Sequence, residues 1–294
     1  MNGVLIINKP RGWTSHDVVA KVRRLLRVSK AGHTGTLDPL ATGVLVVCVG
    51  KATRIARYLE SDEKEYDAEI RLGMITDTLD IEGRVLETKS FEPPAEKDIR
   101  TVLNEFTGTI RQRPPSFSAV KVHGVPAHRL ARSGNAQELP ERDVTIFSLD
   151  LHHYLPPYIR FFVRCSKGTY IRSLGSDIGA RLGTGACLIA LIRTKAGQFT
   201  IDKAMTVEQL AERADRKDIE SALIPLSEVL PGFRRLDLSE HECRLVSHGN
   251  AVPVKPGQEL MQEGEPVRLM DQNGRLIAVA RVKQRFLQPE VVLV

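Results

Sequence analysis

An apolar run at residues 43–50, GVLVVCVG, constrains the fold of this 294-residue chain more than any other segment. Its side chains are apolar without alternation, which predicts a β-strand that is covered on both faces. A strand of this kind needs other layers above and below it, so the chain has to build a substantial core. The run is also far shorter than the ~18 apolar residues that a membrane span requires.

Further strands and helices are predicted on each side of this run. Apolar or alternating segments indicate strands at residues 3–8, 65–73, 159–165 and 186–194. Apolar residues at spacings of three and four indicate helices at residues 15–27, 96–106, 170–182 and 206–213. Ser15 is the expected cap of the first helix. Strands and helices follow no strict βαβ rhythm, so an α+β fold with a mixed, largely antiparallel sheet is favoured.

Two connecting segments lack a periodic pattern. Residues 32–42 are rich in Gly, Thr and Pro and are predicted to form a loop. Residues 108–140 are irregular and rich in Arg, Pro and His, which predicts a long loop insertion. Loops of this length are uncommon in compact domains and often serve binding, although an ordinary surface loop would give the same pattern.

A smaller domain is predicted at the C-terminal end. Prolines and a glycine between residues 225 and 233 mark a linker. A Ser-x-x-Glu capping box follows at residues 239–242. Short strands are then expected at residues 266–270, 276–282 and 290–294. The expected division is a main body at residues 1–230 and a small, mostly β module at residues 231–294.

Positive charge is concentrated in two parts of the sequence. The chain has 42 Lys and Arg against 36 Asp and Glu, a net charge of +6. Residues 1–60 hold ten basic and three acidic residues, and residues 159–200 hold seven and one, so the rest of the chain is acidic. Two basic segments on an otherwise acidic chain are typical of a polyanion-binding surface, but ordinary solvated faces would show the same pattern.

Neither a metal nor a nucleotide cofactor is expected. Cys48, Cys165, Cys187 and Cys243 are far apart, with no CxxC or Cys/His cluster, so a zinc site is not predicted. Buried thiols in a reducing cytoplasm are the simplest interpretation. The sequence has no phosphate-binding loop, dinucleotide fingerprint, nucleophile elbow or HExxH motif. Its N-terminal apolar stretch ends at Lys9, too early for a signal peptide.

Asp38 is the most unusual acidic residue of the chain. It is the one acid in residues 32–45, GHTGTLDPLATGVL, and it directly precedes the predicted buried strand. An aspartate in such a loop commonly forms a turn or caps a helix. The alternative is a carboxylate nucleophile or base at the rim of a sheet, which requires a nearby cation to keep it ionised.

Five segments, in order along the chain, carry a family resemblance. They are residues 2–17 (NGVLIINKPRGWTSHD), 32–45, 64–78 with RLG and then TDT, 114–121 (PPSFSAVK) and 166–172 (SKGTYIR). Together they resemble the motifs of the TruB family of pseudouridine synthases, and five ordered motifs are far more specific than one short pattern. The likeness runs from residue 2 to about residue 205. Residues 231–294 resemble, more weakly, a PUA-type RNA-binding module.

The resemblance implies a reaction that needs no cofactor. Uridine at position 55 in the T loop of tRNA is isomerised to pseudouridine: the N1–C1′ bond breaks, the uracil turns, and C5 joins C1′. Asp38 is implied as the essential catalytic residue, acting on C1′, on C6 of the base, or in proton loss from the sugar. Arg172 is implied as its ion-pair partner, rather than a phosphate contact. Tyr66 is implied as the aromatic residue that packs on the uracil, rather than only a core residue.

Weaker assignments surround this site. The resemblance implies that His33 helps to fill the gap left by the flipped base, although a lone loop histidine is usually a surface residue. It also implies that Tyr170 and Lys9 shape the pocket. The basic side chains expected to contact the RNA backbone are Arg23, Arg24, Arg27, Arg111 and Arg113. Phe117 stands where many members carry a tyrosine, and residues 127–130 also depart from the family pattern; both concern RNA contacts rather than the reaction.

We expect a stand-alone enzyme that acts as a monomer on the T arm of tRNA in the cytoplasm, with no membrane, metal or small-molecule cofactor. The chain begins at the first motif and lacks long basic tails, which favours this interpretation over a guide-RNA-dependent relative. A tRNA-folding chaperone whose catalysis is dispensable is the third interpretation.

Overall fold

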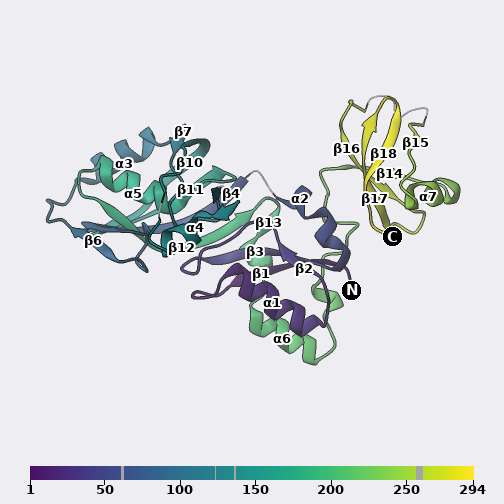
Figure 1. Ribbon diagram of the computed structural model, residues 1–294, viewed down its shortest axis with the longest axis horizontal. Helices are drawn as coiled ribbons and strands as arrows, with labels where there is room; N and C mark the ends of the chain where they lie inside the picture. The colour runs from purple at the N-terminus through teal and green to yellow at the C-terminus, as the bar shows by residue number, and fades with distance from the viewer. Residues whose placement is uncertain (61–62, 123, 136, 256–260) are drawn as a thin grey trace.

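The computed structural model describes residues 1–60, 63–122, 124–135, 137–255 and 261–294. Figure 1 shows a larger part built on one long sheet and a smaller part that has its own sheet and holds the C-terminus. Across these described residues, no helix is both long and apolar enough to cross a membrane.

The main sheet confirms the expectation of a mixed, largely antiparallel arrangement. Its strands lie in the order β1-β3-β12-β4-β11-β10-β7, with β2 paired to β3 and β13 paired to β12. Only β3 and β12 are parallel neighbours; the other pairs of this sheet are antiparallel. The strands are β1 (Gly3–Lys9), β2 (Ala31–His33), β3 (Thr42–Val49), β4 (Glu63–Leu72), β7 (Gly108–Gln112), β10 (Arg142–Leu155), β11 (Tyr158–Ser166), β12 (Ala186–Ala196) and β13 (Phe199–Thr200).

Helices cover the main sheet in two groups. α1 and α6 pack together against β1 and β3, whereas α3 and α5 pack against the half of the sheet that contains β4, β10, β11 and β12. The helices of the described residues are α1 (Ser15–Leu26), α2 (Ala56–Leu59), α3 (Glu96–Glu105), α4 (Ala127–Arg132), α5 (Ile171–Arg181), α6 (Val207–Asp215) and α7 (Glu240–Ser247), with short 3₁₀ turns η1 (Gly50–Ile55), η2 (Ile201–Lys203) and η3 (Glu220–Ala222).

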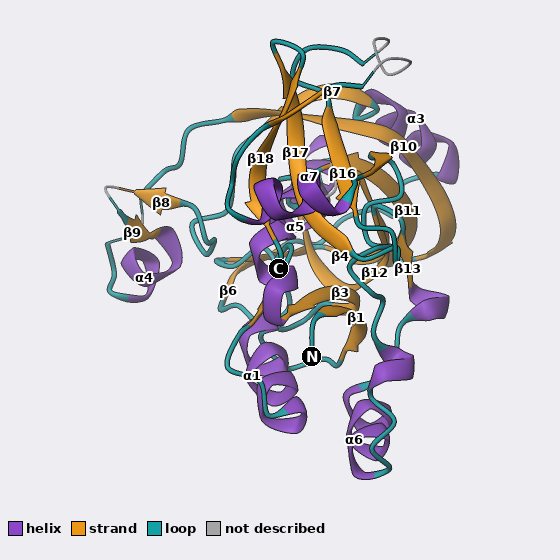
Figure 2. Ribbon diagram, turned by 90° about the vertical axis from the view of Figure 1, so that its right-hand side faces the viewer, coloured by secondary structure: helices purple, strands orange, loops and turns teal. Residues whose placement is uncertain are grey.

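The C-terminal part is a five-stranded sheet with α7 beside it (Figure 2). Its strands lie in the order β14 (Arg234–Asp237), β16 (Pro266–Met270), β17 (Leu276–Lys283), β18 (Phe286–Val292) and β15 (Val252–Pro253). The segment that leads into it is well packed: Val229 and Leu230 are buried, and Arg268 donates hydrogen bonds to the carbonyls of Ser227 (2.7 Å) and Phe233 (3.0 Å).

The apolar run lies in β3 and is buried on both faces, as predicted. Leu45 and Val47 belong to the core formed with α1 and α6. Val44 and Val46 belong to a second core, which also contains Val279 and other residues of the C-terminal sheet. The run is apolar without alternation because two different layers cover its two faces.

The cap of α1 differs from the prediction. Thr14, rather than Ser15, is the N-cap: its Oγ1 accepts a hydrogen bond from the backbone N–H of Asp17 (3.1 Å), and its own backbone N–H donates to the Asp17 carboxylate (2.9 Å). The carboxylate three residues after Thr14 completes a capping box there. The capping box predicted at Ser239 is confirmed, and Thr206 caps α6 with a box of the same kind.

Two segments predicted as loops contain strands. Residues 32–42 begin inside β2, where His33 pairs with Val47 of β3. Residues 108–140 begin with β7, which pairs with β10 at the edge of the main sheet. An edge strand exposes much of its length, so its apolar pattern is weak. The rest of this insertion holds the hairpin β8 (Lys121–Val122) and β9 (Val125–Pro126) and then α4, which project from the body in Figure 2.

Candidate active site

A cavity of about 410 Å³ opens where the loop after β2 meets the start of α5. Its wall includes Asp38, Tyr66 and Tyr170, all of which the sequence analysis singled out. Among the described residues, the ionisable groups of its wall, tyrosines aside, are four basic and two acidic residues: Lys64, Arg142, Lys167, Arg193, Asp38 and Glu60. The excess of positive charge suits a polyanionic substrate.

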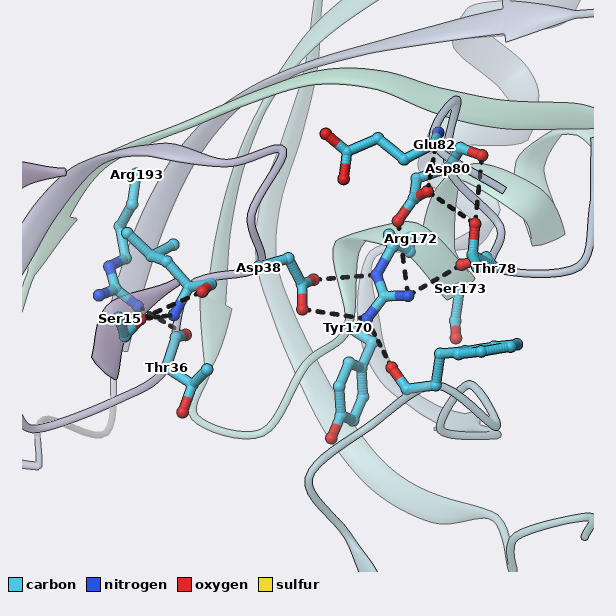
Figure 3. A network of polar contacts seen from close by, with 12 residues as sticks. Ser15, Thr36, Asp38, Thr78, Asp80, Glu82, Tyr170, Arg172, Ser173 and Arg193 are labelled. Atoms are coloured by element: carbon cyan, nitrogen blue, oxygen red, sulfur yellow. Dashed lines mark hydrogen bonds and ion pairs between the residues drawn. The ribbon is translucent and has the colours of Figure 1, made fainter. Parts of the chain in front are cut away.

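Asp38 and Arg172 form a two-pronged ion pair at this cavity (Figure 3). Arg172 Nε lies 2.9 Å from Asp38 Oδ2, and Arg172 Nη2 lies 3.1 Å from Oδ1. The arginine side chain is only 4% exposed, whereas the aspartate side chain is 35% exposed. The pairing therefore fixes the carboxylate while leaving it open to a ligand, as a reactive carboxylate requires.

Other groups hold Arg172 from the opposite side. Its Nη1 donates to the carbonyl of Thr78 (2.9 Å) and its Nη2 donates to the carbonyl of Phe117 (2.9 Å). Asp80 lies 3.6 Å from Nη1 and is itself 8% exposed. Asp80 was not predicted as a site residue, although it stands two residues after the TDT segment. The side chain of Phe117 takes no part in its contact, so a tyrosine there would offer the same carbonyl.

The loop that carries Asp38 is fastened to the N-terminal segment. Ser15 Oγ accepts from the backbone N–H of Leu37 (2.8 Å) and donates to the carbonyl of Leu37 (3.1 Å). Lys9 Nζ donates to the carbonyls of Pro10 (2.9 Å), Trp13 (2.6 Å) and Pro39 (3.3 Å). Burial lowers the pKa of Lys9 to about 8, so it is an ammonium at neutral pH. Lys9 lies behind the loop rather than in the wall of the cavity.

Tyr66 and Tyr170 form aromatic parts of the cavity wall. Tyr66 lies on β4, is 6% exposed, and has its pKa raised by burial. Tyr170 caps α5, and its backbone N–H and carbonyl both bond to the Gln112 amide, at 2.7 and 3.0 Å. The guanidinium of Arg142 lies 4.9 Å from the centre of the Tyr170 ring. Both rings are thus held in place before any ligand arrives.

His33 lies on β2, outside the residues that line the cavity. Its side chain is half-buried, and its Nδ1 is a buried atom with no hydrogen-bond partner among the described residues. Burial and, to a lesser extent, the charge of Arg193 lower the pKa of His33. The imidazole is therefore neutral at pH 7.

Most basic side chains of residues 159–200, which the sequence pattern places on a possible polyanion-binding surface, have carboxylate partners within the chain. Five of the seven basic residues pair with carboxylates of other segments: Arg160 with Asp67, Arg164 with Glu63, Arg172 with Asp38, Arg181 with Glu105 and Lys195 with Glu65. Arg193 is fully buried. Their partners lie far away in the sequence, so a charge count along the chain cannot reveal these pairs.

The remaining predicted backbone contacts fall into two groups. Arg111 and Arg113 pair with Glu141 at 3.4 and 3.3 Å, and Arg113 also lies 2.8 Å from Glu138. In contrast, two arginines of α1 and the arginine at its C-cap are exposed and have no ion-pair partner within the described part of the chain: Arg23, Arg24 and Arg27. These three are free to meet phosphates.

The described residues contain no candidate metal centre, and their cysteines are free. The described residues contain no group of three or more His, Cys, Asp or Glu side chains that could hold a metal ion. Cys48, Cys165 and Cys187 are free and buried, as the simplest interpretation predicted, and Cys243 is half-buried.

Comparison with known proteins defines the class to which this fold and site belong. A family model described as TruB family pseudouridylate synthase (N terminal domain) matches residues 23–171, and one described as tRNA pseudouridylate synthase B C-terminal domain matches residues 172–231. Residues 232–294 lie outside both matched ranges. The fold and the ion-paired carboxylate therefore belong to a pseudouridine synthase.

Individual relatives narrow this assignment. The chain is 45% identical to tRNA pseudouridine synthase B of Moorella thermoacetica, covering 96% of this chain and 94% of the relative, and 43% identical to that of Syntrophus aciditrophicus, covering 96% and 91%. Among solved structures, an H/ACA RNP bound to a substrate RNA containing 2′-deoxyuridine matches with a TM-score of 0.75 and 25% identity, over 99% of this chain and 85% of that one. This chain belongs to the TruB family of pseudouridylate synthases.

The lowered pKa of His33 generates a prediction about acid stability. Because the folded state binds the His33 proton less readily than the unfolded state, unfolding gains protons as the pH falls below about 6.5. We expect stability to be complete near pH 7.5 and to fall on acidification, and to fall less steeply in His33→Gln. Guanidinium unfolding of both proteins at pH 7.5 and 5.5 measures this difference. Equal losses in the two proteins would contradict the assignment of a neutral His33.

Proposed function

We propose that this protein isomerises uridine to pseudouridine at position 55 in the T loop of tRNA, with Asp38 as the catalytic carboxylate. The observation that carries the proposal is the two-pronged ion pair of Asp38 with the buried Arg172 at the mouth of a basic cavity. The family assignment supplies the reaction class, and relatives named tRNA pseudouridine synthase B support tRNA as the substrate.

The reaction requires an ionised carboxylate beside the sugar. Asp38 acts in one of three ways: it attacks ribose C1′, it adds to C6 of the base, or it removes a proton from the sugar. Each of these uses the anion, and Arg172 stabilises that anion. The N1–C1′ bond then breaks, the uracil turns within the cavity and C5 bonds to C1′. A proton leaves C5, a proton binds to N1, and Asp38 is released unchanged. No atom is gained or lost overall, so no co-reactant is needed.

The cavity walls receive the flipped nucleotide. Tyr66 packs against the uracil, where stacking contributes ~1–3 kcal/mol and tolerates rotation of the ring. Tyr170, fixed by Gln112 and Arg142, shapes the opposite wall. Lys9 acts as a positioning residue for the loop, because all three of its contacts are backbone carbonyls. His33 helps to fill the space from which the base has been extruded.

RNA binding outside the cavity offsets the cost of flipping, which is a few kcal/mol. Arg23, Arg24 and Arg27 bind backbone phosphates. In the 108–140 insertion, Arg111 and Arg113 exchange their glutamate partners for phosphates when RNA binds. Residues 1–230 form the catalytic domain, and residues 231–294 form a PUA-like module that binds RNA. The enzyme works as a cytoplasmic monomer on the T arm.

The first test uses Asp38→Asn, which keeps the shape of the side chain but removes its charge. The purified protein is incubated with an unmodified tRNA transcript, without metal or guide RNA, and pseudouridine is mapped by chemical labelling. We expect modification at position 55 by the wild type and a loss of at least ~10³-fold in rate in the variant.

Three outcomes would contradict this function. Activity only after addition of a guide RNA would favour a guide-dependent subunit. Full biological activity of Asp38→Asn in a strain that lacks the wild-type protein would favour a tRNA-folding chaperone. Modification at another uridine would leave the reaction in place and overturn the assignment to position 55.

Arg172→Ala separates electrostatic support of Asp38 from a phosphate contact. Removing one partner of a buried charge pair costs several kcal/mol, so we expect kcat to fall by about 10²–10³-fold. Binding of tRNA, measured by filter retention, is expected to change much less, because Arg172 is buried. Equal losses of rate and of binding would show that Arg172 mainly contacts a phosphate.

The arginines of α1 are tested by the triple variant Arg23→Gln, Arg24→Gln and Arg27→Gln. Loss of three phosphate contacts should weaken tRNA binding and reduce the slope of log K against log salt concentration by about 2 to 3. The matched control carries the same change of net charge at ion-paired positions: Arg160→Gln, Arg164→Gln and Arg181→Gln. Equal effects of the two triple variants would indicate a response to net charge rather than contacts by α1.

A further inference from the structure

Arg193 is a fully buried arginine that the proposed reaction does not use. It lies on β12, is 1% exposed, and forms no ion pair within the described residues. Burying a guanidinium without a carboxylate is costly unless other groups accept its hydrogen bonds. Its position therefore demands an explanation beyond core packing.

Three backbone carbonyls accept hydrogen bonds from Arg193, and all three belong to the segment that carries Asp38. Arg193 Nε donates to Val44 (2.7 Å), Nη2 donates to Gly35 (3.1 Å) and Nη1 approaches Thr36 (3.4 Å). Gly35 and Thr36 precede Asp38, and Val44 follows it. One planar guanidinium thus holds the loop on both sides of the reactive carboxylate. Figure 3 shows Arg193 beside Thr36.

The backbone around Gly43 allows Arg193 to approach the loop closely. β12 runs beside β3 with Arg193 paired to Gly43, whose φ is +98°. A Cβ at Gly43 would lie 2.3 Å from the carbonyl oxygen of Arg193, so only glycine permits this approach. On the other side, Arg193 pairs with Tyr66 of β4. The residue therefore sits between the Asp38 loop and Tyr66, and it lines the cavity.

We propose that Arg193 is a positioning residue for catalysis: by holding the carbonyls of Gly35, Thr36 and Val44, it fixes the loop that presents Asp38 to the nucleotide. This inference rests on the proposed role of Asp38. The planar guanidinium, with donors that point in several directions, matters more than its charge, because the acceptor carbonyls precede and follow Asp38.

The test compares Arg193→Lys and Arg193→Met with Leu210→Ala. Lysine keeps the charge but cannot reach acceptors on both sides of the loop; methionine removes the charge and the donors. Leu210 is fully buried on α6, away from the cavity, so Leu210→Ala is destabilised without touching the loop. Single-turnover rates and KM for the tRNA transcript are measured at a temperature well below the melting transition of every variant.

We expect kcat to fall about 10²-fold in both Arg193 variants, the effect of a displacement of about 1 Å at a reactive group. KM should change less than about threefold, because phosphate contacts lie elsewhere. Leu210→Ala should melt earlier and yet keep the wild-type kcat. In hydrogen exchange of the folded Arg193→Lys protein, amides of residues 35–42 should exchange faster, whereas those of β1 should not.

A kcat within about threefold of the wild type in Arg193→Lys would overturn the proposal and indicate that charge alone is needed. If Arg193→Met does not fold, Arg193→Lys carries the test. A further outcome is a wild type that forms no pseudouridine while the loop amides of Arg193→Lys exchange faster. That result would overturn the function proposed for Asp38, but not the proposal that Arg193 holds the loop. Unchanged hydrogen exchange of residues 35–42 in Arg193→Lys would overturn the proposal that Arg193 holds the loop.

Discussion

The pairing of the buried Arg172 with the half-exposed Asp38 is the interaction on which the site depends. A guanidinium that is 4% exposed has to be compensated from every side, and four groups from three segments supply the compensation: Asp38, the carbonyls of Thr78 and Phe117, and Asp80. Because these contacts saturate the arginine, its position is fixed. The Asp38 carboxylate, which pairs with Arg172, is thereby also held in place and still faces the cavity.

The loop around Asp38 shows how irregular backbone is made rigid. A buried loop needs hydrogen-bond partners that strands and helices would otherwise provide. Ser15 and Lys9 supply them from the N-terminal segment, and Arg193 supplies them from the opposite strand. The N-terminal motif and strand β12 therefore converge on a few peptide groups. Their common effect is to leave Asp38 little freedom before RNA binds.

Apolar periodicity and sequence motifs predicted some elements and site residues, but they could not predict contacts between distant segments. The strand β3 and the α5 helix were predictable because apolar periodicity is a property of neighbouring residues. The ordered family motifs identified Asp38, Tyr66 and Arg172 as candidate site residues. In the structure, Asp38 and Tyr66 line one cavity, and Arg172 forms an ion pair with Asp38. The neutralisation of Arg160 by Asp67 and of Lys195 by Glu65 was not predictable, because strand register joins residues more than 90 positions apart.

The apolar character of β3 on both faces has a further structural consequence. Val44 and Val46 share a core with Val279, so part of the covering of this strand comes from the C-terminal sheet. The contact is reinforced at its rim, where Tyr58 bonds to Glu290 and Glu290 pairs with Arg281. Moving the C-terminal sheet away would expose apolar side chains of the same strand that follows the Asp38 loop. The two parts are therefore separate in sequence but continuous in packing.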